Sequence, residues 1–307
     1  NIYGTIEEDA LRRDFTVNAL YNNIADISNI DYDDGVEDIN RGELKLNGEP
    51  EQRYREDPVR MLRAVRFAAR LGFRITDETL KPIGELADLL DGVPAARLFE
   101  ETLKLFMAGQ AYETFHLLHQ YGLLRYLFPL TESVMSGDYD QRITEMIDQG
   151  LKNTDERIGT GKPVTPAFLF AVLLWEPVRE LAEELRREEQ IAEIPALQQA
   201  ASQVLSEQAQ RVSIPKRFTF MMRDIWTLQP RFQNRAGKRP LRLLGHPKVR
   251  AAYDFMLLRA QAGEVDRELA EWWTSYQDVN GEERGKMSRS GNRPPRRRRR
   301  SKPKQQP

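Results

Sequence analysis

The most regular pattern of apolar and polar positions in the chain lies between Asp57 and Gly72. Apolar residues recur there at helical spacing and share one face, namely Met61, Leu62, Val65, Ala68 and Ala69. Asp57 can cap the first turn with its carboxylate, Pro58 suits the first helical position, and Gly72 suits a left-handed C-terminal cap. The pattern predicts a helix that begins at Pro58, ends at Leu71 and buries its apolar face in the core.

The opposite face of this helix carries four arginines and no Lys or Glu between them: Arg60, Arg63, Arg66 and Arg70. A solvated surface is the simpler interpretation, because charged residues are common on exposed helix faces. However, four cations on one stripe repel one another unless an anion neutralises them. Arginine is also suited to bidentate recognition of phosphate and of base edges. We therefore favour the interpretation that this face binds a polyanion.

Shorter patterns predict the remaining elements. Residues 1–50 have the mixed signals of an α/β unit, with an amphipathic run after Asp14, a strand within 21–30 and a short strand near 44–46. After residue 50 the strand signals stop. Helices are predicted over 76–90, 93–106 and 112–120, and over 137–279 with breaks at 161–163, 194–195, 214–215, 229–230, 239–240 and 246–247.

Charge is distributed unevenly along the chain. The net charge is −1 at pH 7, but residues 286–307 carry +10, which leaves −11 on the rest. From residue 281 onward Gly, Ser, Pro and Arg dominate, so we expect a disordered tail that cannot bury enough apolar surface to fold. This tail would neutralise phosphates without reading sequence, which favours nucleic-acid contact over a solubility tail or a targeting signal. The arginines of the run are Arg296, Arg297, Arg298, Arg299 and Arg300.

The chain has no cysteine, which excludes disulfides and cysteine-based zinc sites and fits a reducing cytoplasm. His116 and His119 lie three apart on a predicted helix with no further histidine nearby, so packed or exposed side chains are favoured over a metal site. The longest apolar run, residues 167–175, predicts a buried helix and is too short to cross a bilayer. We therefore expect a cytoplasmic protein without a membrane span.

One polar cluster near the start of the chain allows two interpretations. Arg12 and Arg13 directly precede Asp14, and an acidic cluster precedes them. In the structural interpretation Asp14 caps a helix and the two arginines balance the acidic cluster. In the functional interpretation the three residues form an active-site corner, with a carboxylate beside two guanidinium groups near a triphosphate. The spacing alone does not decide between them.

Several stretches together resemble one protein family. Residues 12–19 (RRDFTVNA) resemble its arginine–aspartate motif, residues 31–42 (DYDDGVEDINRG) its turn motif, and residues 56–68 (EDPVRMLRAVRFA) its nucleotide-reading motif. Residues 97–101 with Lys104 resemble a fourth motif. The family is that of the class II template-independent nucleotidyltransferases, which comprises CCA-adding enzymes and bacterial poly(A) polymerases. Further likeness to the poly(A) polymerase branch lies in residues 54–63, 153–157, 214–217, 223–226 and the basic tail.

The resemblance implies a mainly α fold: the C-terminal remnant of an α/β nucleotidyltransferase head, all-α neck and body domains, and a disordered basic tail. The expected boundaries are 1–50 for the catalytic head, 51–128 for the nucleotide-reading neck, 129–280 for the RNA-binding body and 281–307 for the arginine-rich tail. The family's Gly-rich phosphate-holding turn and Asp-x-Asp metal pair lie upstream of the arginine–aspartate motif and are not in this sequence. We therefore expect an N-terminally truncated enzyme.

The resemblance also implies roles for individual residues. The complete enzyme would hold two Mg²⁺ ions on the upstream aspartate pair, which activate the RNA 3′-hydroxyl and stabilise the leaving pyrophosphate. Asp14 would complete the catalytic carboxylates, and Arg12 and Arg13 would face the nucleotide. No metal site is expected within this chain, which alone should bind but hardly catalyse.

The chemistry of the bases offers a separate argument about Asp57 and Arg60. A carboxylate accepts hydrogen bonds and a guanidinium donates them, and adenine and cytosine present an amino donor beside a ring-nitrogen acceptor. Guanine and uracil reverse this order, and an unpaired buried polar group costs about 1–3 kcal/mol. The pair would thus admit A and C and reject G and U, whether or not Asp57 also caps its helix. Arg63 and Arg66 would orient the pair or hold ribose and phosphate, while the choice of A over C would depend on pocket size.

These arguments predict a polynucleotide adenylyltransferase that adds AMP from ATP to RNA 3′ ends without a template and so promotes RNA turnover. RNA-degradation proteins are expected as further partners. One alternative is a tRNA CCA-adding nucleotidyltransferase, which shares the motifs through Arg66, although the long helical body and the arginine tail favour the first function. A non-catalytic RNA-binding fragment is an alternative of another class, because the Asp-x-Asp pair is missing.

Overall fold

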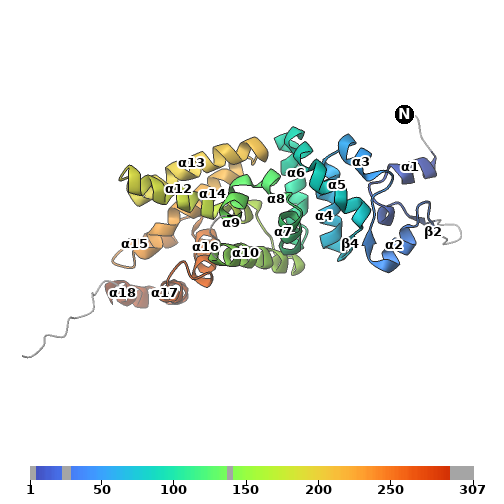
Figure 1. Ribbon diagram of the computed structural model, residues 1–307. Helices are drawn as coiled ribbons and strands as arrows, with labels where there is room; N and C mark the ends of the chain where they lie inside the picture. The colour runs from blue at the N-terminus through green and yellow to red at the C-terminus, as the bar shows by residue number, and fades with distance from the viewer. Residues whose placement is uncertain (1–4, 23–28, 137–140, 291–307) are drawn as a thin grey trace, which may run out of the picture.

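The computed structural model describes residues 5–22, 29–136 and 141–290. These residues form an elongated, mainly α-helical molecule whose short strands lie toward the N-terminal end (Figure 1). The expected fold class is therefore confirmed in its main feature, because a small mixed segment is followed by an array of helices.

The N-terminal segment combines short helices with strands of two residues. Its elements are α1 (Ile6–Arg12), the 3₁₀ helix η1 (Thr16–Asn18), β1 (Tyr21–Asn22), β2 (Asn29–Ile30), α2 (Gly35–Arg41) and β3 (Glu43–Leu44). β1 pairs antiparallel with β2, and β3 pairs in parallel with β4 (Arg74–Ile75). The prediction that strand signals stop after residue 50 is therefore wrong. A strand of two residues is too short to show the alternation on which that prediction relied.

The arginine-rich helix forms one residue later than predicted. α4 spans Val59–Leu71, α3 spans Pro50–Glu56, and the chain turns between them at Asp57. The Asp57 carboxylate accepts a hydrogen bond from the Val59 amide at 3.3 Å, and so satisfies an amide of the first turn. Gly72 ends α4 with a φ of 67°, the left-handed conformation that glycine adopts without strain. The predicted apolar face is buried: Met61, Leu62, Val65, Ala68 and Ala69.

The following helices match the predicted ones closely. They are α5 (Asp77–Leu86), the 3₁₀ helix η2 (Ala87–Gly92), α6 (Ala95–Phe106) and α7 (Ala111–Gln120). Two short helices that were not predicted come next, α8 (Leu124–Leu127) and α9 (Pro129–Ser136). The helix expected over 76–90 changes to 3₁₀ form at Ala87. α7 packs against both α4 and α6, so the arginine-rich helix is embedded in this group.

The rest of the described chain is helical. Its elements are α10 (Gln141–Gly159), α11 (Pro166–Leu173), α12 (Trp175–Glu188), α13 (Glu193–Arg211), α14 (Lys216–Leu228), η3 (Gln229–Gln233), α15 (Arg239–Leu244), α16 (Val249–Gln261), α17 (Arg267–Asp278) and α18 (Gly281–Ser290). The predicted break at 194–195 is wrong. Pro195 lies in the first turn of α13, where a backbone amide has no helical acceptor, so proline is tolerated there.

The chain stays folded beyond residue 280. The guanidinium of Arg284 on α18 donates to the carbonyl oxygens of Tyr276 at 2.9 Å and Gln277 at 2.7 Å, both on α17. Ser288 is also buried. The prediction of a disordered tail from residue 281 is therefore wrong for α18, whose tertiary contacts composition does not reveal. Residues 291–307, with the arginines at 296–300, lie outside the described residues.

Buried apolar side chains form two clusters. The larger extends from Phe15 to Ala262, and the smaller lies within residues 228–276. Helix α11 is mostly buried, as the apolar run predicted. Because the larger cluster crosses residue 128, the predicted neck and body share one core, and the domain boundaries stay a prediction. Within the described parts of the chain, no helix has the length and apolar character that a membrane span requires.

Gly150 lets α10 approach α11 closely, which gives a testable expectation. A Cβ at this position would lie 2.8 Å from Cγ1 of Val172, whose branched side chain has little rotamer freedom. We expect Gly150→Ala to lower the free energy of unfolding by about 1–3 kcal/mol, measured by urea denaturation. Gly159→Ala, at the end of the same helix with open space around its Cβ, should be neutral or slightly stabilising. Equal effects of the two substitutions would contradict the close packing.

Candidate functional site

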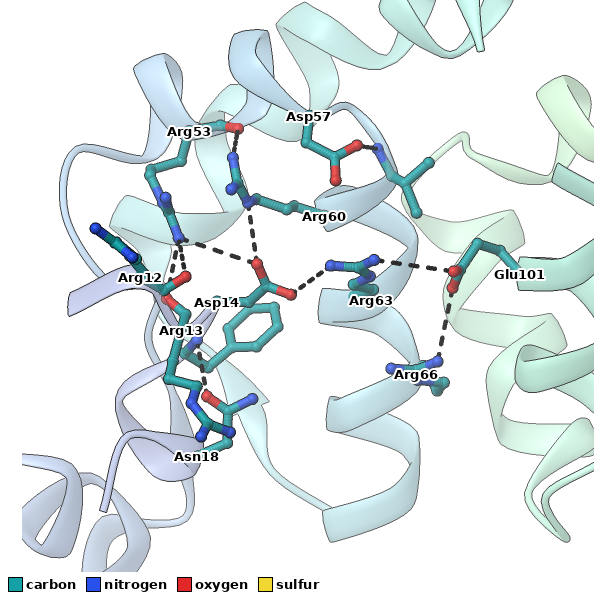
Figure 2. A network of polar contacts seen from close by, with 12 residues as sticks. Arg12, Arg13, Asp14, Asn18, Arg53, Asp57, Arg60, Arg63, Arg66 and Glu101 are labelled. Atoms are coloured by element: carbon teal, nitrogen blue, oxygen red, sulfur yellow. Dashed lines mark hydrogen bonds and ion pairs between the residues drawn. The ribbon is translucent and has the colours of Figure 1, made fainter. Parts of the chain in front are cut away.

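Asp14 lies at the turn between α1 and η1, where the chain is fixed by its neighbours. The backbone amide of Asn47 donates to the Asp14 carbonyl at 3.0 Å, and Phe15 is fully buried in a β-bridge with Leu46. The Phe15 ring also packs against Phe67 of α4, with ring centroids 5.3 Å apart. These contacts bring the Asp14 side chain against the helix that carries the arginines (Figure 2).

The Asp14 carboxylate accepts hydrogen bonds from two arginines of α4. Arg60 Nε lies 3.0 Å from Oδ1 and Arg63 Nη1 lies 2.7 Å from Oδ2, and Arg53 of α3 adds an ion pair at 3.9 Å. Burial alone would raise the pKa of Asp14, but the hydrogen bonds from Arg63 and Arg60 outweigh it and lower that pKa. Burial would likewise lower the pKa of Arg63, but its bond to Asp14 raises it. The carboxylate is therefore held in its charged form.

A second carboxylate, Glu101 of α6, meets the other end of the arginine stripe. Its side chain is 4% exposed, and its oxygens lie 3.6 Å from Arg66 Nη1, 4.0 Å from Arg63 Nη2 and 2.8 Å from Lys104 Nζ. Desolvation lowers the pKa of Arg66, and the charge of Glu101 opposes that shift. We call Arg60, Arg63 and Arg66 the arginine row. The row ties α4 to carboxylates on two other segments of the chain (Figure 2).

The arginine row is therefore not a solvated face. Its side chains are only 14–27% exposed, and the protein itself supplies the anions that the spacing required. The balance of charge stays positive, because five cations surround three carboxylates. The cations are Arg53, Arg60, Arg63, Arg66 and Lys104, and the carboxylates are Asp14, Glu56 and Glu101. Such a surplus attracts further anions. Arg70, one turn further on, is exposed instead.

Asp57 and Arg60, expected to act together on a base edge, have separate protein partners. Asp57 accepts from the Val59 amide with Oδ1 and from Arg97 of α6 with Oδ2 at 2.7 Å. Arg60 uses Nε for Asp14 and Nη1 for a backbone carbonyl at 2.7 Å. The two side chains are thus held independently of each other. Because they lie three residues apart at the start of a helix, they occupy neighbouring positions (Figure 2).

Arg12 and Arg13 lie apart from the arginine row. Both are exposed, and Arg13 pairs with Asp9 at 3.1 Å, so it balances the acidic cluster as the structural interpretation expected. The guanidinium groups that donate hydrogen bonds to Asp14 are those of Arg60 and Arg63 on α4. The prediction of a corner in which Arg12 and Arg13 flank the Asp14 carboxylate is therefore wrong. Asp14 does not cap a helix either, because Phe15 is the N-cap of η1. The backbone is extended at Arg13, where α1 ends, and again at Phe15. Successive side chains of an extended chain point in opposite directions, which separates the side chain of Arg13 from that of Asp14. A contact of Arg12 and Arg13 with a nucleotide stays a prediction.

Several members of the network were not predicted as site residues, among them Arg53 and Glu101. Arg53 lies on α3, on the far side of the turn at Asp57, and its position depends on tertiary structure. Glu101 did give a signal, because it lies at helical spacing between Leu98 and Leu105 on the buried stripe of α6. A carboxylate on an apolar stripe is costly unless it is paired. The sequence could therefore have indicated a buried ion pair at Glu101.

Asp14 is also the residue that the resemblance gives as completing the catalytic carboxylates. Both of its oxygens accept hydrogen bonds from arginines. Across the residues that the structure describes, no group of three or more Asp, Glu, His or Cys side chains could hold a metal ion. Among the described residues, the carboxylate of Asp14 and its neighbours therefore do not fit a two-Mg²⁺ site by themselves.

The ion pairs of Asp14 should make stability depend on pH. Because its pKa is lowered in the folded state, the contribution is fully present above the usual value of 3.8 and is lost as the pH falls through the lowered pKa. We expect Asp14→Asn to reduce the free energy of unfolding at neutral pH by about 1–3 kcal/mol, because two arginines lose a charged partner. The difference from the wild type should shrink as the pH falls below 3.8.

Urea denaturation over a series of pH values measures both effects. Asp9→Asn is the matched control, since it removes an exposed carboxylate that pairs with Arg13, and it should change stability little. A loss of stability in Asp14→Asn that stays the same at all pH values would show that the charge of Asp14 is not its cause.

Three family models match the chain. Residues 1–45 match the poly A polymerase head domain, residues 72–135 match a segment described as the probable RNA and SrmB-binding site of polymerase A, and residues 189–306 match the polymerase A arginine-rich C-terminus. The three matches follow one another in order and together cover most of the chain.

Individual proteins show the same relationship. Poly(A) polymerase I of Salmonella typhi is 48% identical over 307 residues, which is 99% of this chain and 66% of that protein. The chain thus spans just under two thirds of the length of such relatives. The CCA-adding enzyme of Leuconostoc mesenteroides is 39% identical over 123 residues, 40% of this chain and 30% of that protein.

A solved structure shares the fold. The Thermotoga maritima CCA-adding enzyme complexed with tRNA has a TM-score of 0.58 at 20% identity, and the match covers 91% of this chain and 64% of that one. The order of the family models and the identity over nearly the whole chain confirm the resemblance that the motifs indicated. The chain belongs to the poly(A) polymerase family of nucleotidyltransferases.

Proposed function

We propose that the protein containing this chain is a polynucleotide adenylyltransferase, which adds AMP from ATP to RNA 3′ ends without a template. The observation that carries the proposal is the arginine row. It is half-buried, fixed by Asp14 and Glu101, rich in positive charge, and adjacent to the carboxylate of Asp57. A nucleoside triphosphate needs such a combination, because its base offers hydrogen-bonding groups and its phosphates offer negative charge.

Asp57 and Arg60 would select the base. Each carboxylate oxygen can accept two hydrogen bonds, so Asp57 keeps accepting capacity beside its bonds from Val59 and Arg97. The bonds of Arg60 to the protein use Nε and Nη1, so Nη2 can serve as a donor. An acceptor beside a donor matches the amino group and ring nitrogen of adenine or cytosine. Guanine and uracil would leave both protein groups unpaired.

Arg63 and Arg66 would hold the ribose and the phosphates. Their bonds to Asp14 and Glu101 fix the guanidinium groups before a nucleotide binds, which reduces the entropy lost on binding. The family likeness supports a place for Asp14 among the catalytic carboxylates and for Arg12 and Arg13 on the nucleotide side. We also propose that the Mg²⁺ expected of the family is held mainly by carboxylates other than those described.

The extent of the likeness favours polyadenylation over CCA addition. The match to a poly(A) polymerase extends over nearly the whole chain, whereas the match to a CCA-adding enzyme covers less than half of it. The sequence likeness to the polymerase therefore includes the helical body and the C-terminal region, whereas the sequence likeness to the CCA-adding enzyme is confined to a shorter part of the chain. A non-catalytic RNA-binding module stays as the second candidate, because one of the matching family models is named for RNA binding.

RNA would be the second substrate. The match at residues 72–135 to a segment named for RNA binding supports this, and the name of that segment also includes a protein partner, SrmB. The arginines at 296–300 would neutralise phosphates of any sequence, which suits an enzyme that extends many different RNAs. These roles are consistent with a protein that acts in the cytoplasm.

The products of the reaction distinguish the candidates. With full-length protein, an unstructured RNA and each nucleotide in turn, we expect long tails with ATP and little extension with GTP or UTP, as resolved on a sequencing gel. Extension restricted to tRNA would favour CCA addition. RNA binding without transfer to either RNA would favour the non-catalytic module.

Asp57→Asn tests base selection directly. The asparagine amide can donate as well as accept, so guanine and uracil lose part of their penalty. We expect the ratio of kcat/KM for ATP over GTP to fall about tenfold, which corresponds to about 1.4 kcal/mol. Arg70→Gln, an exposed change on the same helix, should keep the wild-type ratio. An unchanged ratio in folded Asp57→Asn protein would refute the role of Asp57 in base selection.

A further inference from the structure

A groove of about 530 Å³ lies on the helical body, apart from the arginine row. Its walls are the C-terminal half of α10, the loop that joins α10 to α11, and α16 along its whole length, with contributions from α11 and α14. The volume lies in the range of about 300–1,000 Å³ that is typical of ligand sites. The nucleotide site proposed above uses none of its residues.

Apolar side chains line the inside of the groove. Phe168, Met221 and Leu257 are each half-buried, so part of their surface faces the opening. Phe168 is fixed by edge-to-face packing against Phe255, with ring centroids 6.2 Å apart. A fixed aromatic ring and a polarizable thioether both pack well against flat rings. The bases of an unpaired nucleic acid have such flat faces.

Charged side chains surround this apolar lining, with an excess of cations. The cations are Arg157, Lys162, Lys248 and Arg250, and the carboxylates are Glu156 and Asp254. One carboxylate is neutralised already, since Asp254 pairs with Arg250 at 3.1 Å. Arg157 Nη2 donates to the Pro163 carbonyl at 3.0 Å and so fixes the loop that carries Lys162. The groove is therefore basic, although residues 1–285 carry a net −11.

We infer that this groove binds the single-stranded RNA upstream of its 3′ end. Bases pack on Phe168, Met221 and Leu257, and phosphates pair with the surrounding cations. The inference rests on the proposed function, because the ligand is the strand that the enzyme extends. A double helix keeps its bases stacked inside and away from such a lining. An acidic peptide matches the charge but offers no row of flat rings, so the apolar lining favours RNA.

One helix links the groove to the arginine row. α7 packs against α4, which carries the row, and against α10, which forms a wall of the groove. A strand held in the groove would therefore have to pass α7 for its 3′ end to reach the row.

Reversing two charges of the groove tests the inference in the full-length protein. We expect the double variant Lys162→Glu/Lys248→Glu to bind a labelled oligoadenylate of about fifteen nucleotides about tenfold more weakly. The slope of log affinity against log salt should fall by about 1.4, because two phosphate contacts are lost. Fluorescence anisotropy without ATP gives both quantities.

A second double variant controls for net charge. Lys81→Glu/Lys238→Glu makes the same change at exposed positions outside the groove, and should keep the wild-type affinity and salt slope. Urea denaturation shows whether both double variants fold. Deletion of residues 291–307, which leaves α18 intact, should lower the slope by the same amount in the wild type and in the groove variant, because the two regions are independent.

Several results would overturn the inference. These are equal weakening by the control variant, and an unchanged affinity or salt slope in the groove variant. Polyglutamate that competes at the groove more strongly than oligoadenylate would assign it to a protein partner instead. Since binding is measured without ATP, RNA binding that depends on the groove cations, without any adenylyl transfer, would refute the proposed function and leave the groove assignment in place.

Discussion

The arrangement of the site depends on the ion pairs that the charged carboxylate of Asp14 forms with Arg60 and Arg63. Burying several guanidinium groups on one side of a helix is costly unless anions accompany them, and removing one partner leaves the others uncompensated. Asp14 meets this need for Arg60 and Arg63, and Glu101 meets it for Arg66. The same bonds attach the N-terminal mixed segment and α6 to α4. The arginine stripe therefore acts as a structural joint as well as a cationic surface.

This double use has a consequence for ligand binding. The carboxylates reduce the positive charge of the row, which weakens its attraction for an anion, but they also fix the guanidinium groups in place. A flexible set of arginines would lose side-chain entropy when a nucleotide bound, about 0.5–1.5 kcal/mol for each immobilised side chain. Because Asp14 and Glu101 already fix the arginine row, this side-chain entropy is lost during folding rather than on binding. Selectivity for a base needs this rigidity, because a mobile donor could adapt to any base edge.

Sequence analysis succeeded where the signal was local and failed where it depended on distant contacts. The apolar stripe of α4 and its cap at Gly72 follow from spacing within one helix, and both were predicted. The partners of the stripe were not, because Asp14 lies 46 and 49 residues from the arginines that it binds. The parallel pairing of β3 with β4 and the docking of α18 likewise depend on contacts between segments. The family motifs contain Asp14 and the arginine row but do not show which of these residues meet.

The continuous core bears on how the proposed nucleotide site and the proposed RNA groove would act together. The larger apolar cluster extends from Phe15, beside Asp14, to Ala262 at the end of α16. Protein interiors are packed as densely as organic crystals, so elements that share such a core keep their relative positions. If the predicted neck and body had separate hydrophobic cores, they could move independently. Instead α7, in the predicted neck, contacts both α4 of the neck and α10 of the predicted body. A strand held on the body would therefore present its end to the arginine row at a constant distance, and successive additions would require the RNA, rather than the protein, to move.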